Sequence, residues 1–375
     1  MKRLGRIAAI VILIFLCITF IPLVGVGLEC RPFASATPAQ TTEAANSAAP
    51  AEMGQITASL SGYARPEDQT YLTLPEWYIV YSADEYAAFS ANNPPSGFPY
   101  FQAIGQYWRS YYAVCAVTRD QYPFNSGYHL TLAVIGTSFT LENILKGIYE
   151  NTLGRATEWL SSSALTEEDA YASQVAKEYG DFIHTIPWYE FPFDEKFKGL
   201  WRETNLWGPN AIRKWERKVA LSLEYGGKAI YAWLIGQGTQ AAYAPEDLEI
   251  QGWAEGVSAE VLQQEPQLRV VKTINDQAAI VALPRYEAFS QIAPRLARQG
   301  VRLIELAGND EILITAIAPR DWVYDLPEGE FLFAMPILTQ PTLQRVAVKA
   351  PVKSLHLILA DLEDSGLKIE HVYDY

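Results

Sequence analysis

A cluster of four basic residues lies near one face of a predicted helix in an otherwise acidic chain. The four stand at positions i, i+1, i+4 and i+5 of that helix: Arg213, Lys214, Arg217 and Lys218. Cations gathered in this way can bind phospholipid headgroups or another acidic ligand. The alternative is a solvated helix face, partly balanced by Glu216. The four residues are therefore the candidate binding site, and the solvated face is the competing interpretation.

A second group combines carboxylates with an imidazole. Its members follow one another at steps of three residues, with one more carboxylate soon after: Glu178, Asp181, His184 and Glu190. Such groups can bind a divalent metal or act as an acid–base pair. Steps of three drift around a helix, however, so the alternative is a set of surface charges with one capping or core histidine. If the chain is an enzyme, Asp181, His184 and Glu190 are its candidate catalytic residues.

Short motifs that fix a reaction are missing from the sequence. There is no G-x-S-x-G, no P-loop, no G-x-G-x-x-G turn and no Cys/His spacing typical of zinc. The remaining histidines, His129, His356 and His371, are scattered along the chain and are expected to be structural. The sequence therefore predicts neither a metal site nor a cofactor, and it favours a non-enzymatic protein.

The first element that must position these residues is an apolar segment at the N-terminus. Lys2, Arg3 and Arg6 precede Ile7–Leu28, a stretch of 22 residues without charge. As a helix this stretch would be about 33 Å long, enough to cross a hydrocarbon core of roughly 30 Å. Cations on its N-terminal side favour a cytoplasmic amino terminus. The sequence thus predicts a single-pass membrane protein whose bulk is periplasmic or otherwise extracytoplasmic.

Two other interpretations of this leader are open. The A-x-A motif at residues 34–36 offers a signal-peptidase site, although the apolar region is longer than the usual stretch of about 7–15 residues. Cys30 could be lipidated, but Glu29 stands where a small residue is expected. A retained anchor is therefore favoured. Cys30 and Cys115 could also form a disulfide in an oxidising compartment, which the sequence does not decide.

Composition limits the partners and the domain organisation that the rest of the chain can have. The formal net charge of −14 repels nucleic acid, so no nucleic-acid partner is expected. A content of 49% hydrophobic and 13% aromatic residues predicts well-packed globular domains. Residues 34–69 have the Ala/Thr/Pro-rich composition of a flexible spacer. After them we expect a helical domain over 70–245, a polar linker over 246–266 and an α+β domain over 267–375.

Capping signals and periodicity predict helices in the first domain. Ser82, with Glu85 three residues later, reads as a capping box, and Thr166 precedes three acidic residues. Between them, aromatic and apolar residues recur at three-and-four spacing over residues 101–115, which predicts a helix with a buried face.

Two further stretches of this domain carry small residues along one side. Residues 129–149 and 219–240 are expected to be helices that pack closely through these positions. The alternative is that both helices enter the membrane. Against it, four charged residues fall within the turns that a span would need: Glu142, Lys146, Glu224 and Lys228. A charge near the centre of a span costs about 2.5–3.5 kcal/mol.

The C-terminal region contains an internal repeat. Pro284 and Pro351 each lead into a predicted helix, and Gly300 and Gly366 each separate that helix from a strand. Two strand–helix–strand units with added hairpins predict one sheet with both helices on one face, a ferredoxin-like α+β domain. Pro294 inside the first of these helices predicts a kink or an early end.

The predicted fold class is α+β, with a single N-terminal transmembrane helix, a mainly helical, aromatic-rich domain and a C-terminal α+β sandwich with duplicated units. The favoured function is a non-enzymatic envelope module for binding or assembly, tethered to the membrane by Ile7–Leu28. It would engage an apolar small molecule or a partner protein through the helical domain or the interdomain cleft. The alternative is a metal-assisted or acid–base enzyme that acts on an envelope substrate through the region of Asp181, His184 and Glu190.

Overall fold

The structure is a computed structural model of the chain, and it describes residues 22–30, 59–60, 62–161, 164–239 and 248–374. Within these residues the fold is mixed α and β, as predicted. Most of the predicted span and of the predicted spacer lies outside them. The chain divides into two compact units, and unit 1 comprises Met1–Glu76, Gln106–Thr137 and Pro245–Tyr375. Unit 2 comprises Trp77–Gly105 and Ser138–Ala244.

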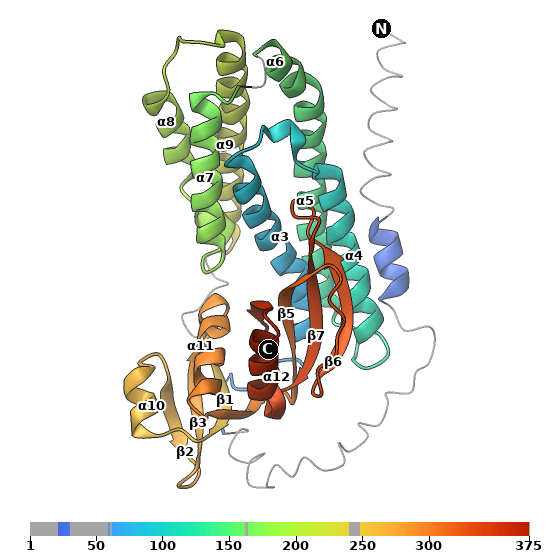
Figure 1. Ribbon diagram of the computed structural model, residues 1–375, viewed down its shortest axis with the longest axis vertical. Coiled ribbons are helices and arrows are strands. Elements are labelled where there is room, and N and C mark those ends of the chain that lie inside the picture. Colours follow the sequence, from blue (N-terminus) through green and yellow to red (C-terminus); the bar gives the residue numbers. More distant parts are fainter. Residues whose placement is uncertain (1–21, 31–58, 61, 162–163, 240–247, 375) are drawn as a thin grey trace. The chain divides into compact units, whose positions relative to one another are not determined.

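Helices make up the described part of the chain up to Thr239 (Figure 1). They include α3 (Gln69–Ser90), α4 (Tyr100–Thr118), α5 (Ser126–Tyr149), a π-helical turn η2 (Glu150–Gly154), α6 (Arg155–Leu160), α7 (Glu167–Ile183), α8 (Phe193–Glu203) and α9 (Ala211–Thr239). Residues 70–76 and 106–137, expected in the helical domain, belong to unit 1. The predicted helix over residues 101–115 is confirmed as part of α4.

The two capping predictions have different outcomes. At the start of α7, Thr166 Oγ1 accepts a hydrogen bond from the Asp169 amide at 3.3 Å, and Asp169 Oδ2 accepts one from the Thr166 amide at 3.0 Å. That capping box satisfies two amides that a helix start leaves unpaired. The start predicted at Ser82 is wrong, because α3 runs without a break from Gln69 to Ser90.

The small residues of α5 pack against α4 and not against α9. A side chain on Gly136 would meet the ring of Tyr107, and one on Gly147 would meet Tyr100 and Phe101. Gly227, by contrast, has open space around it. The predicted close packing of 129–149 on 219–240 through glycines is therefore wrong. Large aromatic rings on α4 fill the space that the glycines of α5 leave.

Unit 1 contains two separate four-stranded antiparallel sheets, where the sequence predicts one. The first has the order β2-β3-β1-β4 and is formed by β1 (Glu249–Glu255), β2 (Arg269–Thr273), β3 (Ala278–Pro284) and β4 (Arg302–Leu306). The second has the order β6-β7-β5-β8 and is formed by β5 (Glu311–Pro319), β6 (Glu330–Pro336), β7 (Leu343–Pro351) and β8 (Lys368–Val372). The two orders are equivalent, so the repeat is a duplication of a whole sheet.

The element that makes the first sheet complete lies in the predicted linker. Residues 246–266 contain β1 and the short helix α10 (Ala259–Gln264), so a strand and a helix stand where a linker is expected. With them, the first repeat has the order β-α-β-β-α-β of the ferredoxin-like arrangement. The polar and acidic composition conceals β1, and Gly252 at its centre is an unusual strand residue. Without β1 the sequence offers too few strands for two sheets.

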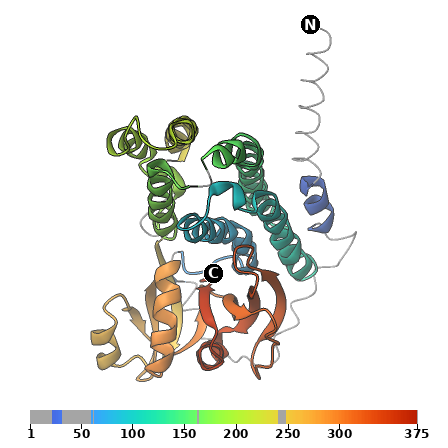
Figure 2. The same cartoon turned by 45° about the horizontal axis from the view of Figure 1, so that its top comes forward.

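Two helices cover these sheets and share one core with them. Figure 2 shows α11 (Glu287–Arg298) and α12 (Leu355–Asp364), the helices of the first and second repeats. Their side chains join both sheets in a single apolar cluster that includes Val281, Ile292, Ile314 and Ile358. Pro294 lies inside α11, which continues to Arg298, so the predicted early end is wrong.

The repeated glycines end α11 and α12 as predicted. Gly300 and Gly366 have φ values of +80° and +75°, a left-handed conformation that glycine adopts without steric cost. The parts of α3 and α4 that belong to unit 1 attach to the second sheet. Thr70 Oγ1 accepts a hydrogen bond from the Leu313 amide at 2.8 Å, and Gln106 donates to the Pro336 carbonyl.

Candidate functional site

The four basic residues predicted as a binding site are buried in unit 2. They lie on the first two turns of α9, and their exposed fractions are between 1% and 3%. Arg213 Nη2 contacts Glu158 Oε1 at 3.1 Å, and Arg217 Nη1 contacts Glu150 Oε1 at 2.7 Å. The structure therefore shows neither a solvated basic face nor cations that are open to an external headgroup.

Carboxylates from three other elements surround this cluster. Asp169 on α7 lies 2.9 Å from Arg217 Nε, and Glu168 contacts the ammonium of Lys214 at 3.2 Å. Lys218 contacts the other oxygen of Glu168 at 3.4 Å. Two more carboxylates come from α6 and from α9 itself. The cluster thus unites η2, α6, α7 and α9 in one network that holds the bundle together.

The cations of this network can be buried because nearby carboxylates compensate their charges. Four buried cations face four buried carboxylates and the nearly buried side chain of Glu216: Glu150, Glu158, Glu168 and Asp169 are the four. Burial raises the pKa of Glu150, against the nearby charge of Arg217, which lowers it. Each cation thus already has an anionic partner at short distance. A buried network of this kind specifies how the helices assemble more than it adds net stability.

A second group of ion pairs links α5 to α9. Lys146 contacts Glu142 at 3.0 Å and Glu224 at 2.7 Å, while Lys228 contacts Glu142 at 2.8 Å. These are the four charged residues that argue against membrane spans at 129–149 and 219–240. In the structure they face one another between α5 and α9 in unit 2, where their side chains are partly exposed. Ion pairs, and not glycines, make the α5–α9 contact.

The residues predicted as a catalytic group do not come together. Asp181 pairs with Lys177 at 2.7 Å on the exposed side of α7, and Glu178 pairs with Lys196. Glu190 is exposed on a separate short helical turn. These three carboxylates are therefore surface charges and do not form a catalytic group.

The imidazole of the same group has a partner that the sequence does not indicate. His184 Nε2 lies 2.8 Å from Asp84 Oδ2, and Trp77 packs edge-on against the ring at a centroid distance of 6.0 Å. Both polar side chains are partly exposed. A carboxylate that orients an imidazole is one half of an acid–base arrangement. Asp84 is 100 residues away in the chain, so no local pattern could have revealed it.

Two cysteines and a histidine meet in unit 1. Cys30 and Cys115 form a disulfide, and their sulfurs and a ring nitrogen of His129 lie within 4.8 Å of one another. Tyr111 Oη is 2.9 Å from His129 Nδ1, and burial lowers the pKa of His129 to about 4. A neutral imidazole with two thiolates is a donor set that suits Zn²⁺. It would be available only after reduction of the disulfide.

Residues 22–30 lie along one face of α4. Residues 22–29 are helical, Tyr112 donates a hydrogen bond to the Pro22 carbonyl at 3.1 Å, and Arg119 pairs with Glu29. Together with the disulfide, these contacts follow α4 over two turns. The end of the predicted span is thus folded against unit 1. No helix within the described residues has the length and mean hydropathy that crossing a bilayer requires.

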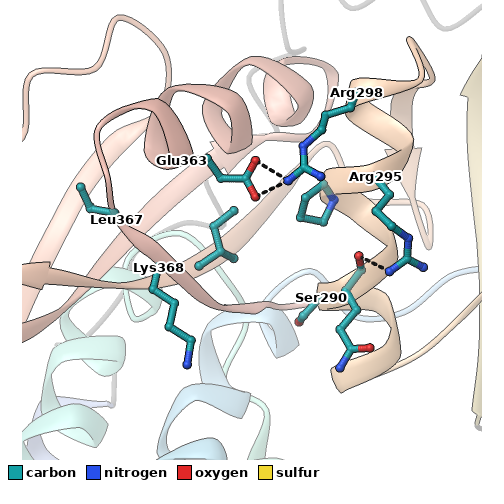
Figure 3. A pocket seen from close by; sticks show the side chains of 9 residues that line it. Ser290, Arg295, Arg298, Glu363, Leu367 and Lys368 are labelled. Atoms are coloured by element: carbon teal, nitrogen blue, oxygen red, sulfur yellow. Dashed lines mark hydrogen bonds and ion pairs between the residues drawn. The ribbon is translucent and has the colours of Figure 1, made fainter.

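A shallow groove of about 380 Å³ opens beside α11 and β8 in unit 1 (Figure 3). Arg298 Nη2 donates to both carboxylate oxygens of Glu363 at 2.7 Å, and Arg295 makes a similar two-point contact with Glu265 at 2.8 and 2.9 Å. Both arginines are thus engaged with carboxylates. The groove presents paired charges and has no nucleophile–base constellation among its lining residues.

Comparison with protein-family models, with curated proteins and with solved structures finds no match to this chain.

Proposed function

We propose that this chain is a non-enzymatic binding or assembly module of the cell envelope, tethered by Ile7–Leu28 as a single transmembrane helix. Both folded units would lie outside the cytoplasm, with the amino terminus inside. The helical region and the duplicated α+β region would be the working parts of the module. The observation that carries this proposal is the bond between Cys30 and Cys115.

That bond supports a retained leader over the two alternatives. Cleavage after Ala36 would remove Cys30 with the leader, and lipidation would consume the Cys30 thiol. Either event would leave Cys115 without the partner that it has in the structure. The contacts of Glu29 and Pro22 with α4 would be lost on cleavage as well.

The same bond supports an extracytoplasmic position. Disulfides persist in oxidising compartments and are rare in the cytosol, where thiols are kept reduced. Cys30 lies just after the apolar segment, on the side opposite to Lys2, Arg3 and Arg6. The positive-inside rule and the redox requirement of the disulfide thus favour the same orientation.

A surface for a hydrophobic partner is present on unit 2. Exposed large apolar side chains occur along α9, among them Leu223 and Ile230, which are 73% and 65% exposed. Exposed apolar residues that gather on one side of a protein mark a contact surface. This surface supports binding or assembly as the role of the helical region.

A reporter fusion tests the proposal. Alkaline phosphatase fused after Tyr375 should be active, because this enzyme folds only in an oxidising compartment. The full chain should also stay in the membrane fraction after carbonate washing, and its intact mass should include residues 1–36. A carboxyl terminus in the cytosol, or a soluble mature chain that begins at Thr37, would overturn the proposal.

The Asp84–His184 pair favours a second candidate function, an acid–base or metal-assisted enzyme. Its support is the 2.8 Å contact between Asp84 Oδ2 and His184 Nε2 at a partly exposed position. Stoichiometric zinc that is lost in His184→Ala but kept in His356→Ala would favour this enzyme. Equal metal content in the two variants and the unchanged chain would remove it.

A further inference from the structure

The helix α9 has its charged residues on the inside and its apolar residues on the outside. The inward residues are Arg213, Lys214, Arg217 and Lys218, followed by Glu224 and Lys228 in the ion pairs with α5. The exposed large apolar residues form a line that we call the outer stripe: Ile212, Val219, Leu223, Ile230, Trp233 and Leu234. A water-facing helix has the opposite distribution.

The outer stripe is narrow and continuous. Ile212, Val219, Leu223 and Ile230 follow at steps of seven, four and seven residues, which return to the same side of a helix. At 1.5 Å per residue the stripe is about 33 Å long. The exposed positions of α9 between residues 211 and 236 include no charged side chain. Water therefore meets only apolar or uncharged groups along this side of the helix.

Two other helices of unit 2, α5 and α6, also expose large apolar residues while nearby charged residues pair internally. On α5, Leu145 and Ile148 are exposed while Lys146 faces the ion pairs. On α6, Trp159 is 77% exposed while its neighbour Glu158 is buried against Arg213. The apolar outside is therefore a property of several helices and not an accident of α9.

Amphipathic aromatic rings flank the stripe at both ends. Trp207, which is 73% exposed, packs against Trp215 near the start of α9. Trp233 is exposed near the other end, where Tyr231 packs against Trp188 at a centroid distance of 5.1 Å. Tryptophan and tyrosine prefer the boundary between hydrocarbon and headgroups. The outer stripe, apolar along its length and aromatic at its ends, thus has the composition expected of a helix at a lipid surface.

Exposed charges on the neighbouring helices determine whether α9 could cross a bilayer or could only lie along its surface. Lys177 and Asp181 on α7 are about 70% exposed, and α8 carries the exposed Asp194 and Lys198. The helices α7 and α8 both pack along α9. If α9 crossed the bilayer, these charges would enter it too, at about 2.5–3.5 kcal/mol each. A helix that lies along the surface leaves them in water.

We propose that the outer stripe of α9 lies in the boundary between acyl chains and headgroups, on the membrane that carries the anchor. This inference rests on the proposed function, because the anchor holds unit 2 at that membrane. The occupant is hydrocarbon and not an anionic headgroup, since the stripe has no cation and the chain has a net charge of −14. Attachment is therefore independent of anionic lipid and of salt, unlike that of a basic amphipathic helix.

Photo-crosslinking in the full chain tests this inference. The photoreactive residue p-benzoylphenylalanine is placed at Leu223, and the protein is reconstituted in vesicles of phosphatidylcholine that contain a tagged lipid. The matched control is Val323 in unit 1, an equally exposed apolar residue with 78% exposure. A third position, Phe15, reports the predicted span. The readouts are a lipid adduct and a change of size on a denaturing gel.

A lipid adduct at Leu223 but not at Val323, unchanged in high salt, is the expected result. A crosslinked dimer at Leu223 without lipid would assign the stripe to a second copy and overturn the inference. The absence of any adduct at Leu223, with lipid captured at Phe15, would also overturn it while the tether stands. The absence of lipid at Phe15 would instead contradict the proposed function.

Discussion

Cys30 is bonded to Cys115, so the end of the predicted span is fixed to the last turn of α4. The bond closes a loop of 85 residues, which contains the whole predicted spacer. Removal of a bond that closes such a loop costs about 4.5 kcal/mol, mainly because the unfolded chain gains freedom. The spacer therefore cannot separate α4 from the end of the predicted span, whatever its composition.

Cleavage of the spacer tests this arrangement. With a protease site introduced among residues 37–58, the cut chain should run as one species without reductant, because the disulfide joins its two parts. Reductant should separate them, and Cys115→Ser should separate them in either condition. Two fragments from the unchanged chain on a non-reducing gel would contradict the bond.

Loss of one buried cation should strongly destabilise unit 2. Arg217→Met leaves Glu150 and Asp169 buried without their guanidinium, which we expect to lower the free energy of unfolding by about 3–5 kcal/mol. The matched control is Lys177→Met, which breaks the exposed pair with Asp181 and should cost at most about 1 kcal/mol. Denaturant unfolding measures both.

A rescue variant keeps that prediction specific. Glu150→Gln combined with Arg217→Met removes one of the stranded charges and should restore part of the lost stability. If Arg217→Met were as mild as Lys177→Met, or if the double variant gave no recovery, the buried network would not have the role described here.

Stability should fall in acid through His129. Its pKa is about 4 in the folded chain because of burial, against about 6.5 when unfolded. Between these values the unfolded chain binds the extra proton, so the stabilisation is complete above pH 6.5 and is lost as the pH falls toward 4. We expect a loss of about 2 kcal/mol, since solvent near the ring screens part of the shift.

Comparison with His129→Phe isolates this titration. Phenylalanine can occupy the space between Tyr111 and Phe124, which both stack on the imidazole ring. The variant should show a flatter pH dependence of unfolding between pH 6.5 and 4. Parallel profiles for the two proteins would assign the acid sensitivity to other groups.

Two glycine substitutions should have opposite effects. Gly136→Ala places a methyl group 2.2 Å from a ring carbon of Tyr107, and we expect about 1–3 kcal/mol of destabilisation from overpacking. Gly227→Ala adds a methyl group in open space and should stabilise α9 by about 0.5–1 kcal/mol through helix propensity. Thermal unfolding measures both. A destabilising Gly227→Ala would revive the close glycine contact between α5 and α9.

Local signals account for what could be predicted of the fold. The acidic helix start after Thr166 and the glycines at 300 and 366 act within one turn of their helices, and the structure confirms them. Strands with dense β-branched residues, such as β3, were equally clear. The sequence does not indicate β1, because Gly252 and acidic neighbours hide its alternation, and without β1 it predicts one sheet where the structure has two.

The candidate sites depended on partners that lie far away in the chain. Arg213 and Arg217 were recognised as a cluster, but their burial depends on Glu150, Glu158 and Asp169, which come from other helices. Spacing within one helix cannot reveal such partners. For the same reason, the sequence could not predict the contact between His184 and Asp84. The predicted partners of His184, Asp181 and Glu190, do not contact it in the structure.

The inward charges of α9 also set an order of events in biogenesis. Released alone into lipid, this helix would bring five cationic side chains with only Glu216 and Glu224 as counterions of its own. Its carboxylate partners on α6, α7 and η2 must therefore gather around it in an aqueous compartment first. Under the proposed docking, seating the finished bundle on the bilayer is then the last step of maturation, and a chain arrested before that step should already be folded and held at the membrane by its anchor alone.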